Sequence, residues 1–234
     1  NVRNLKGQVD DIELVLFEDA DAGNIPTEQD LAELKQISVE TSLTYTVHLP
    51  LDIDLGAESA SKRRIEIQRV VKLIDRFAYI KPFAYVLHLN LSEKSKRNIT
   101  LWRLNVSNSL EELLSSVSAD SRDIAVENLH YPFRYVEDII EKKDLSVCVD
   151  IGHLNLGKED VLSHLARHIQ RTRVIHWHGI RDGKDHVSLR HVSFNEVHGV
   201  MKFLQKHQYG GVLTLEVFNQ NDFEESLSCI KGSL

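Results

Sequence analysis

The sequence is poor in cysteine and has no long apolar run, and these two absences exclude several classes of protein. Only Cys148 and Cys229 occur in 234 residues, and two widely separated cysteines do not make the framework of a disulfide-stabilised secreted domain. No stretch of about 18 apolar residues is present, so we expect no membrane-spanning segment. The low cysteine content favours a reducing compartment, and we predict a cytoplasmic protein.

An excess of positive charge is also missing. The chain has 28 Lys and Arg against 35 Asp and Glu, a formal net charge of −7, and the basic residues are spread out except at 62–64 and 94–97. A protein that binds phosphate backbones concentrates Lys and Arg on one surface. We therefore expect a small-molecule substrate and neither a nucleic-acid nor a membrane partner, and we leave assembly into a homo-oligomer open.

Short β-rich runs alternate with amphipathic helical stretches along the whole chain. Apolar residues such as Ile67, Val70 and Ile74 recur at helical spacing. The predicted strands are 12–17, 43–49, 83–89, 124–129, 145–151, 173–177 and 212–217. The predicted helices lie at about 26–40, 58–79, 110–117, 134–142, 158–171, 195–207 and 222–230.

Strands that alternate with helices form βαβ units around a parallel sheet. Seven such repeats are too many for most small doubly wound domains and one short of a closed eight-stranded barrel. We predict an α/β fold, a (β/α)8 TIM barrel that forms one domain over residues 1–234. We expect its first strand and most of its first helix to be missing, with 1–6 as the tail of that helix. An open doubly wound sheet is the alternative.

Side chains that bind divalent cations stand at the ends of the predicted strands. They are His48, His88, Glu127, Asp150, His176 and Glu216, with His153 and His178 close behind. One such residue alone is more often a hydrogen-bonded core or rim residue than a ligand. In a barrel, however, the carboxyl ends of the strands carry the active site, and charge after an apolar strand is costly unless it is paired or metal-bound. The set therefore predicts a metal site.

The remaining histidines lie in the loop after the sixth strand and on helices. In that loop, 181–191, the adjacent Asp185 and His186 are candidate ligands, whereas we expect Asp182 and His191 to be solvated. We expect a surface position for four histidines on outer helices, His164, His168, His198 and His207.

In their order and spacing these residues resemble the xylose isomerase-like barrels (AP endonuclease family 2), which include endonuclease IV and many sugar isomerases and epimerases. The likeness covers the chain and is carried by Ile12-Glu-Leu, His48-Leu-Pro, His88, Glu127-Asn128, Asp150-x-x-His153, His176, 185–186 and Glu216. The resemblance implies one to three divalent metals, and donors without thiolate suit Zn, Mn, Fe or Co.

The endonuclease IV-like version of the site would use up to three metals. His48, His88 and Glu127 would hold one, and Glu127 would bridge to a second, held with Asp150, His176 and Glu216. His153 and His186, with Asp185, would hold a third. That family's loop reads Asp-x-His before a Gly-rich stretch, whereas here Asp185 directly precedes His186 and the glycines are missing, so the third metal departs from the pattern.

The isomerase-like version would use one metal between Glu127, Asp150, His176 and Glu216, with the two glutamates exchanging protons. Clustered metals suit phosphoester hydrolysis, whereas one metal beside two carboxylates suits proton transfer next to a sugar carbonyl. The additional histidines favour the hydrolase, with Glu127, Glu216 and His176 as catalytic residues. The alternatives are a sugar isomerase or epimerase and a non-catalytic ligand-binding barrel.

A narrower likeness concerns the segment that contains His48. The stretch 44–56, Thr-Tyr-Thr-Val-His-Leu-Pro-Leu-Asp-Ile-Asp-Leu-Gly, resembles the cobamide-remodelling phosphodiesterases, which cleave the nucleotide-loop phosphodiester of cobamides. This likeness implies a corrinoid substrate, contacted by Trp177 and the loop 181–191. Asn128 and His178 are further candidate substrate contacts, and the alternative for Trp177 is an ordinary core residue.

Overall fold

The computed structural model describes residues 2–17 and 24–233. Contacts between residues divide the chain into two compact units, Asn1–Ser146 and Val147–Leu234, and each is described by itself below. The expectation of one domain over the whole chain stays a prediction. Among the described residues, no helix combines the length and the apolar character needed to cross a membrane.

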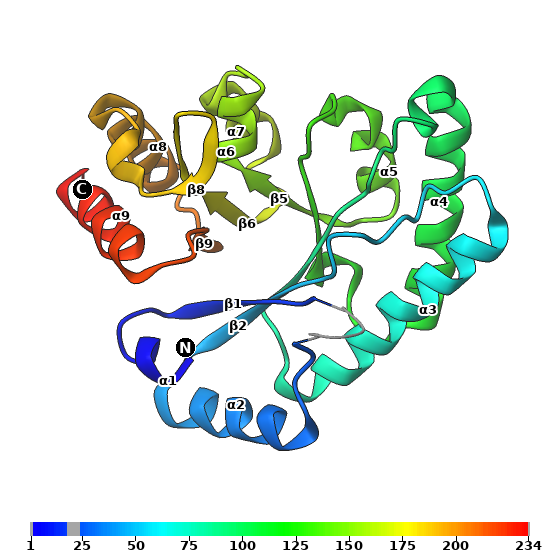
Figure 1. Cartoon of the computed structure of the whole chain (residues 1–234), viewed down its shortest axis with the longest axis horizontal. Helices are drawn as coiled ribbons and strands as arrows, with labels where there is room; N and C mark the ends of the chain where they lie inside the picture. Colours follow the sequence, from blue (N-terminus) through cyan, green and yellow to red (C-terminus); the bar gives the residue numbers. More distant parts are fainter. Residues whose placement is uncertain (1, 18–23, 234) are drawn as a thin grey trace. The chain divides into compact units, whose positions relative to one another are not determined.

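The first unit is built on four parallel strands that pair in chain order (Figure 1). They are β1 (Asp11–Val15), β2 (Thr44–His48), β3 (Ala84–Leu87) and β4 (Ile124–Glu127). In this register Val15 is paired with His48, and His48 in turn with Val86. Parallel pairing brings the carboxyl ends of β2, β3 and β4 to the same edge, so the polar residues that follow these strands become neighbours.

Helices connect these strands, and their ends follow local signals in the sequence. Thr27 caps α2 (Glu28–Thr41) with a capping box that includes Asp30, and Ser59 caps α3 (Ala60–Phe77). Figure 1 shows α3 beside α4 (Ile99–Ser116), which it contacts. The shorter helical segments are α1 (Val2–Leu5), η1 (Ala78–Ile80), η2 (Ser95–Asn98), η3 (Ser121–Asp123), η4 (Phe133–Tyr135) and α5 (Glu137–Lys142). The helix tail expected at 1–6 is thus confirmed for 2–5, and residue 1 lies outside the described residues.

The second unit contains three parallel strands in the order β5-β6-β9. They are β5 (Ser146–Asp150), at whose first residue the boundary between the units falls, β6 (Thr172–Trp177) and β9 (Val212–Leu215). Its helices are α6 (Ile151–Leu156), α7 (Val161–His168), η5 (Leu189–His191), α8 (Phe194–Lys206) and α9 (Gln220–Ser233). Asp150 and His176 are paired in the β5–β6 register, so both candidate ligands lie at the carboxyl end of this sheet.

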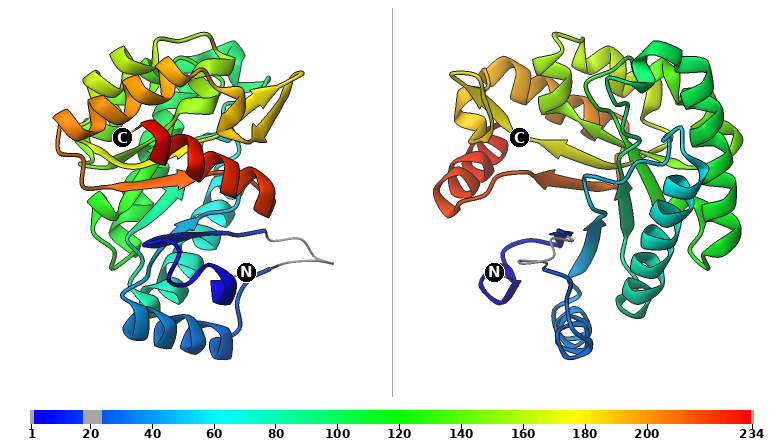
Figure 2. Two further views of the ribbon diagram at one scale, coloured as in Figure 1. Left: turned by 90° about the vertical axis from the view of Figure 1, so that its left-hand side faces the viewer. Right: turned by 45° about the vertical axis from the view of Figure 1, so that its right-hand side comes forward.

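Two segments of the second unit differ from the prediction. The single helix expected at 158–171 is α7 alone, and a separate helix, α6, begins directly after β5 because Asp150 caps it. The polar loop after β6 contains an antiparallel hairpin, β7 (Gly179–Arg181) and β8 (Lys184–Val187), which projects from the unit in the left view of Figure 2. Asp182 and Gly183 have φ of 52° and 76°, the left-handed pair that a type I′ turn requires.

The expectation that His164 and His168 are surface residues is wrong. Both are half-buried on α7, with ring centroids 4.6 Å apart. Burial lowers the pKa of each imidazole to about 4, and Arg167 contributes in the same direction. These rings therefore stay neutral in the folded chain at pH values where an unfolded chain would protonate them.

This burial predicts a specific sensitivity to acid. Below about pH 6.5, the unperturbed histidine pKa, the unfolded chain binds more protons at His164 and His168 than the folded chain does. Stability contributed by these neutral rings is therefore lost as the pH falls from 6.5 toward 4. The variant H164Q/H168Q should lose several degrees less in Tm than the wild type between pH 7 and pH 5, because about 1 kcal/mol shifts Tm by roughly 2–4 °C at this size.

The matched control is H207Q, which changes an exposed histidine at the end of α8 and should behave as the wild type. Equal acid sensitivity of the wild type and the double variant would contradict the prediction.

Candidate metal centre

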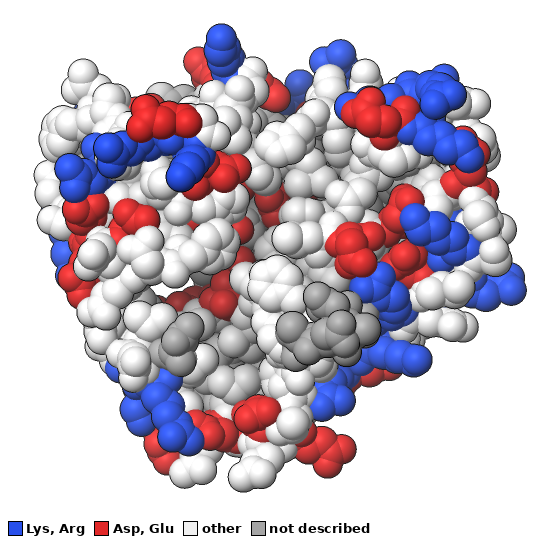
Figure 3. Space-filling view, in the orientation of Figure 1, with Lys and Arg blue, Asp and Glu red and all other residues white. Residues whose placement is uncertain are grey.

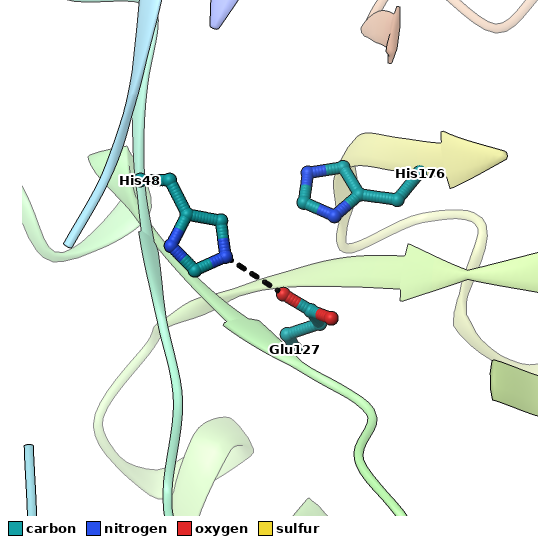
Figure 4. A group of neighbouring side chains, drawn as sticks. All are labelled: His48, Glu127 and His176. Carbon is teal, nitrogen blue, oxygen red and sulfur yellow. Dashed lines mark hydrogen bonds and ion pairs between the residues drawn. The ribbon is translucent and has the colours of Figure 1, made fainter. Parts of the chain in front are cut away.

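The first unit brings three of the predicted ligands together on one carboxylate oxygen. Oε2 of Glu127 lies 3.2 Å from Nε2 of His48 and 2.9 Å from Nε2 of His88. Figure 4 shows the contact with His48 as a dashed line. Glu127 and His48 are almost fully buried, and the two imidazole rings meet edge to face, with centroids 4.9 Å apart. Three donors from β2, β4 and the residue after β3 thus converge.

The proton on His48 shows what this cluster can bind. Nδ1 of His48 lies 2.8 Å from the carbonyl oxygen of Leu49, and a carbonyl oxygen only accepts, so Nδ1 carries the ring proton. The neutral ring therefore turns the lone pair of Nε2 toward the Glu127 carboxylate. Two lone pairs this close require a proton or a metal ion between them. Metal-bound histidines typically donate their other ring N–H to a carbonyl in this way.

The separations between these donors also fit one metal ion. Two ligands about 2.0–2.1 Å from a tetrahedral zinc ion stand roughly 3.3 Å apart. The distances of 3.2 and 2.9 Å from the histidine nitrogens to Glu127 are close to such an edge. Imidazole and carboxylate donors without a thiolate suit Zn, Mn, Fe or Co. The residues present therefore fit a divalent metal.

The loop that follows β2 is held in place by side chains that sequence reasoning missed. The side-chain amide of Asn90 donates to the carbonyl oxygens of Leu51 and Ile53 at 2.7 and 2.8 Å, and Ser109 of α4 donates to that of Leu55 at 2.8 Å. The indole of Trp102 packs so closely on Gly56 that a Cβ there would overlap it. These bonds fix the backbone next to His48, and an Asn directly after the strand predicted at 83–89 was the signal that could have revealed them.

In the second unit, Asp150 and His153 are brought together by the start of α6. Oδ1 of Asp150 accepts from the backbone N–H of His153 at 2.8 Å, as the helix cap. Oδ2 lies 3.4 Å from Nδ1 of His153. The carboxylate of Asp150 is completely buried, and Nε2 of His178, also buried, is 3.5 Å from Oδ1. Asp150, His153 and His178 each place one donor atom within 4.8 Å of the others.

Glu216, just after β9, is the centre of another group in the second unit. Its carboxylate oxygens lie 3.5 Å from Nδ1 of His176 and 3.5 Å from Nε2 of His186. Donor atoms of His178, His186 and Glu216 again lie within 4.8 Å of one another. His176, which Figure 4 labels on β6, is completely buried.

His186 carries a positive charge at this position. Its Nδ1 lies 3.2 Å from Asp185, and the contact with Glu216, supported by that with Asp185, raises the pKa of His186 to about 9 against the effect of burial. Although burial opposes it, the same ion pair lowers the pKa of Asp185. A proton on His186 thus compensates carboxylate charge that a metal ion would compensate instead.

The residues predicted as substrate contacts have different surroundings. Asn128 and Trp177 are almost fully buried, as is His178, while the exposed residues of the hairpin, Arg181 and Lys184, face solvent. Their roles as substrate contacts stay predictions. The position of His178 beside Asp150 was not expected. From the sequence, His178 was a candidate substrate contact at the end of the strand that carries His176.

Comparison with known proteins places the chain in a family. The model of the xylose isomerase-like TIM barrel family (AP endonuclease family 2) matches residues 8–232. The chain therefore belongs to the xylose isomerase-like TIM barrels, and the predicted (β/α) barrel class is confirmed. No curated protein sequence matches this chain.

Solved structures similar to this chain include proteins of different activities. A D-tagatose 3-epimerase-like protein is 18% identical with a TM-score of 0.78, over 96% of this chain and 88% of that one. Endonuclease IV from Thermus thermophilus is 15% identical with a TM-score of 0.75, over 99% and 92%. Another Thermus thermophilus protein, soaked with ZnCl2, is 21% identical with a TM-score of 0.69, over 94% and 87%. At these identities the likeness establishes the fold alone.

The first cluster generates a direct test of metal binding. Glu127→Gln keeps the size of the side chain and removes the negative charge that His48 and His88 share. The affinity for Zn²⁺, measured by isothermal titration calorimetry, should fall by at least about 100-fold, since loss of an outer-shell partner alone costs about 10–100-fold.

Glu66→Gln is the matched control, because Glu66 is a buried glutamate of the same unit that pairs with Arg69 at 2.8 Å. Unchanged zinc affinity in E127Q, or an equal loss in both variants, would count against the assignment of Glu127.

Proposed function

We propose that this protein is a divalent-metal-dependent phosphodiesterase that acts on a small molecule. The observation that carries the proposal is the convergence of His48 and His88 on Glu127, 3.2 and 2.9 Å away. A single metal held by Glu127, Asp150, His176 and Glu216, as in the isomerase-like version, would leave His48 and His88 without a function. A second and third metal give them one, and clustered metals suit phosphodiester hydrolysis.

The metals would supply Lewis acidity, which lowers the pKa of a bound water and neutralises charge on the phosphoryl oxygens. The side chains have the complementary tasks. His48 keeps its Nδ1 proton on the carbonyl of Leu49 and presents Nε2 to the site. Burial of Glu127 and His176 excludes bulk water and strengthens their electrostatic interactions. His186 is half-buried and pairs with Glu216 and Asp185. It holds a proton between these two carboxylates.

The alternative is a sugar isomerase or epimerase. It is supported by the likeness to an epimerase-like structure and by the presence of two glutamates, Glu127 and Glu216, able to exchange protons. It does not account for His48 and His88, and this difference allows a test.

The choice of a small molecule over a nucleic acid is part of the proposal. On the face drawn in Figure 3, Lys and Arg side chains are interspersed with Asp and Glu. Several Lys and Arg side chains of the described residues pair with acids of their own unit, as Lys62 does with Asp54 at 2.9 Å and Arg190 with Glu225 at 2.7 Å. We likewise propose a cytoplasmic location from the low cysteine content.

His88→Ala separates the two reactions. With Zn, Mn, Fe or Co supplied, the wild type should hydrolyse bis(4-nitrophenyl) phosphate, and kcat/KM should fall by about 10²–10³-fold in H88A, the usual loss when one group that stabilises the transition state is removed. His191→Ala, in the second unit, is the control and should retain activity.

Turnover of an aldose–ketose panel that survives H88A would instead establish the isomerase. A metal content of one ion per chain, measured by mass spectrometry of the purified protein, would also contradict the phosphodiesterase.

A finer proposal concerns the substrate and rests on the likeness of the segment 44–56 to cobamide-remodelling phosphodiesterases. The contacts of this segment support the proposal, because Asn90, Trp102 and Ser109 fix its backbone. A segment fixed in this way could form one side of a substrate-binding site. The hairpin 179–187 and its exposed Arg181 and Lys184 offer contacts for a large ligand.

Incubation of a cobamide with the metal-loaded protein should yield a corrinoid that lacks its nucleotide loop, detected by mass spectrometry. The reaction should disappear in E127Q. Hydrolysis of bis(4-nitrophenyl) phosphate without cleavage of cobamides would reject the cobamide while leaving the phosphodiesterase in place.

A further inference from the structure

The role of His178 follows from which of its ring nitrogens carries the proton. The backbone N–H of His186 donates to Nδ1 of His178 at 3.0 Å. An amide N–H can only donate, so Nδ1 must accept, and the neutral ring carries its proton on Nε2. The carbonyl oxygen of Gly179, 3.2 Å from Nδ1, would suit the opposite tautomer. That tautomer would direct two hydrogens at each other between His178 and His186.

The protonated nitrogen of His178 faces Asp150. Nε2 is 3.5 Å from Oδ1, the oxygen that also accepts from the backbone N–H of His153. We propose that His178 is a positioning residue: its Nε2–H and the His153 amide hold Oδ1, so that Oδ2 of Asp150 is presented to the metal. The inference rests on the proposed function only in taking Asp150 as a ligand.

This role excludes His178 from the ligand set, although its ring lies among candidate ligands. A nitrogen that binds a metal needs its lone pair. The lone pair of His178 is on Nδ1, where it accepts the hydrogen bond from the backbone N–H of His186. His48 has the opposite arrangement, because its Nδ1 faces the carbonyl oxygen of Leu49 and its lone pair is on Nε2. His48, the last residue of β2, and His178, the residue after β6, therefore have different chemical roles.

The surroundings of His178 hold the ring in this orientation. It stacks on His186 with centroids 4.2 Å apart and planes 9° from parallel. On another side it lies against Gly152 of α6, where a Cβ would overlap the imidazole. Gly152 is thus required by the ring of His178, which explains the glycine in the sequence Asp150-Ile-Gly-His153.

The tautomer can be measured directly. In protein labelled with ¹⁵N-histidine, two-bond ¹H–¹⁵N correlations should show His178 protonated at Nε2 both without metal and with Zn²⁺ bound, with H178Q used to assign the signal. A proton on Nδ1 in either state would overturn the proposal. Because the metal-free protein is also measured, this result is separate from the proposed function, which fails if the protein binds no metal.

Zinc titration tests the positioning role of His178 separately from its tautomer. His178→Ala should keep the number of zinc ions per chain and lower the affinity of one by about 10–100-fold, the effect of an outer-shell partner. His178→Gln, which can place an amide N–H near the position of Nε2, should recover most of that loss. Loss of one zinc equivalent in H178A would make His178 a ligand and overturn the proposal.

Gly152 provides an independent variant that leaves His178 in the chain. Gly152→Ala should displace the ring and weaken zinc binding as H178A does, whereas Gly157→Ala at the end of the same helix meets only ordinary contacts and should bind as the wild type. In an H178A background, Gly152→Ala should have no further effect, because the ring it would meet is absent. An equal additional loss in that background would contradict the proposal.

Discussion

The carboxylate of Glu127 is buried at the end of an apolar strand, and the structure of the first unit depends on how its charge is compensated. A buried carboxylate without a partner is strongly destabilising. His48 and His88 supply the partners, and both approach the same oxygen. They reach it because parallel strands place consecutive strand ends side by side, and because the bonds of Asn90 and Ser109 fix the loop after β2. The fold of this unit and its candidate metal site therefore share one requirement.

The second unit meets the same requirement with other means. Asp150 is compensated in part by the start of α6, where backbone N–H groups are available. Glu216 faces His176 and the positively charged His186. In both units protons and N–H groups occupy positions around carboxylates where a divalent cation would be stabilised. In each unit, binding of a metal ion would therefore compete with protonation of the same groups.

Much of the fold was predictable from the sequence because it depends on local signals. Each predicted strand is present within a few residues. The ligands predicted at strand ends lie at or next to those ends, whereas Asp185 and His186 lie within β8 and His153 lies within α6. The hairpin at 179–187 was missed although its signal, Asp182-Gly183 between β-prone residues, is a local one. The burial of His164 and His168 could not be predicted from local sequence signals. Helical periodicity shows which residues share a face, but not what packs against that face.

The sequence by itself determined the family, the alternation of strands and helices, and the types of donor at each strand end. These properties follow from apolar periodicity and from residue order. Only the tertiary structure decided the chemical state of each donor. His48 and Glu127 are 79 positions apart, and the amide that fixes the proton of His178 belongs to His186, across the hairpin. A histidine has two tautomers of similar energy, so its role depends on which hydrogen-bond partner the folded chain brings to it.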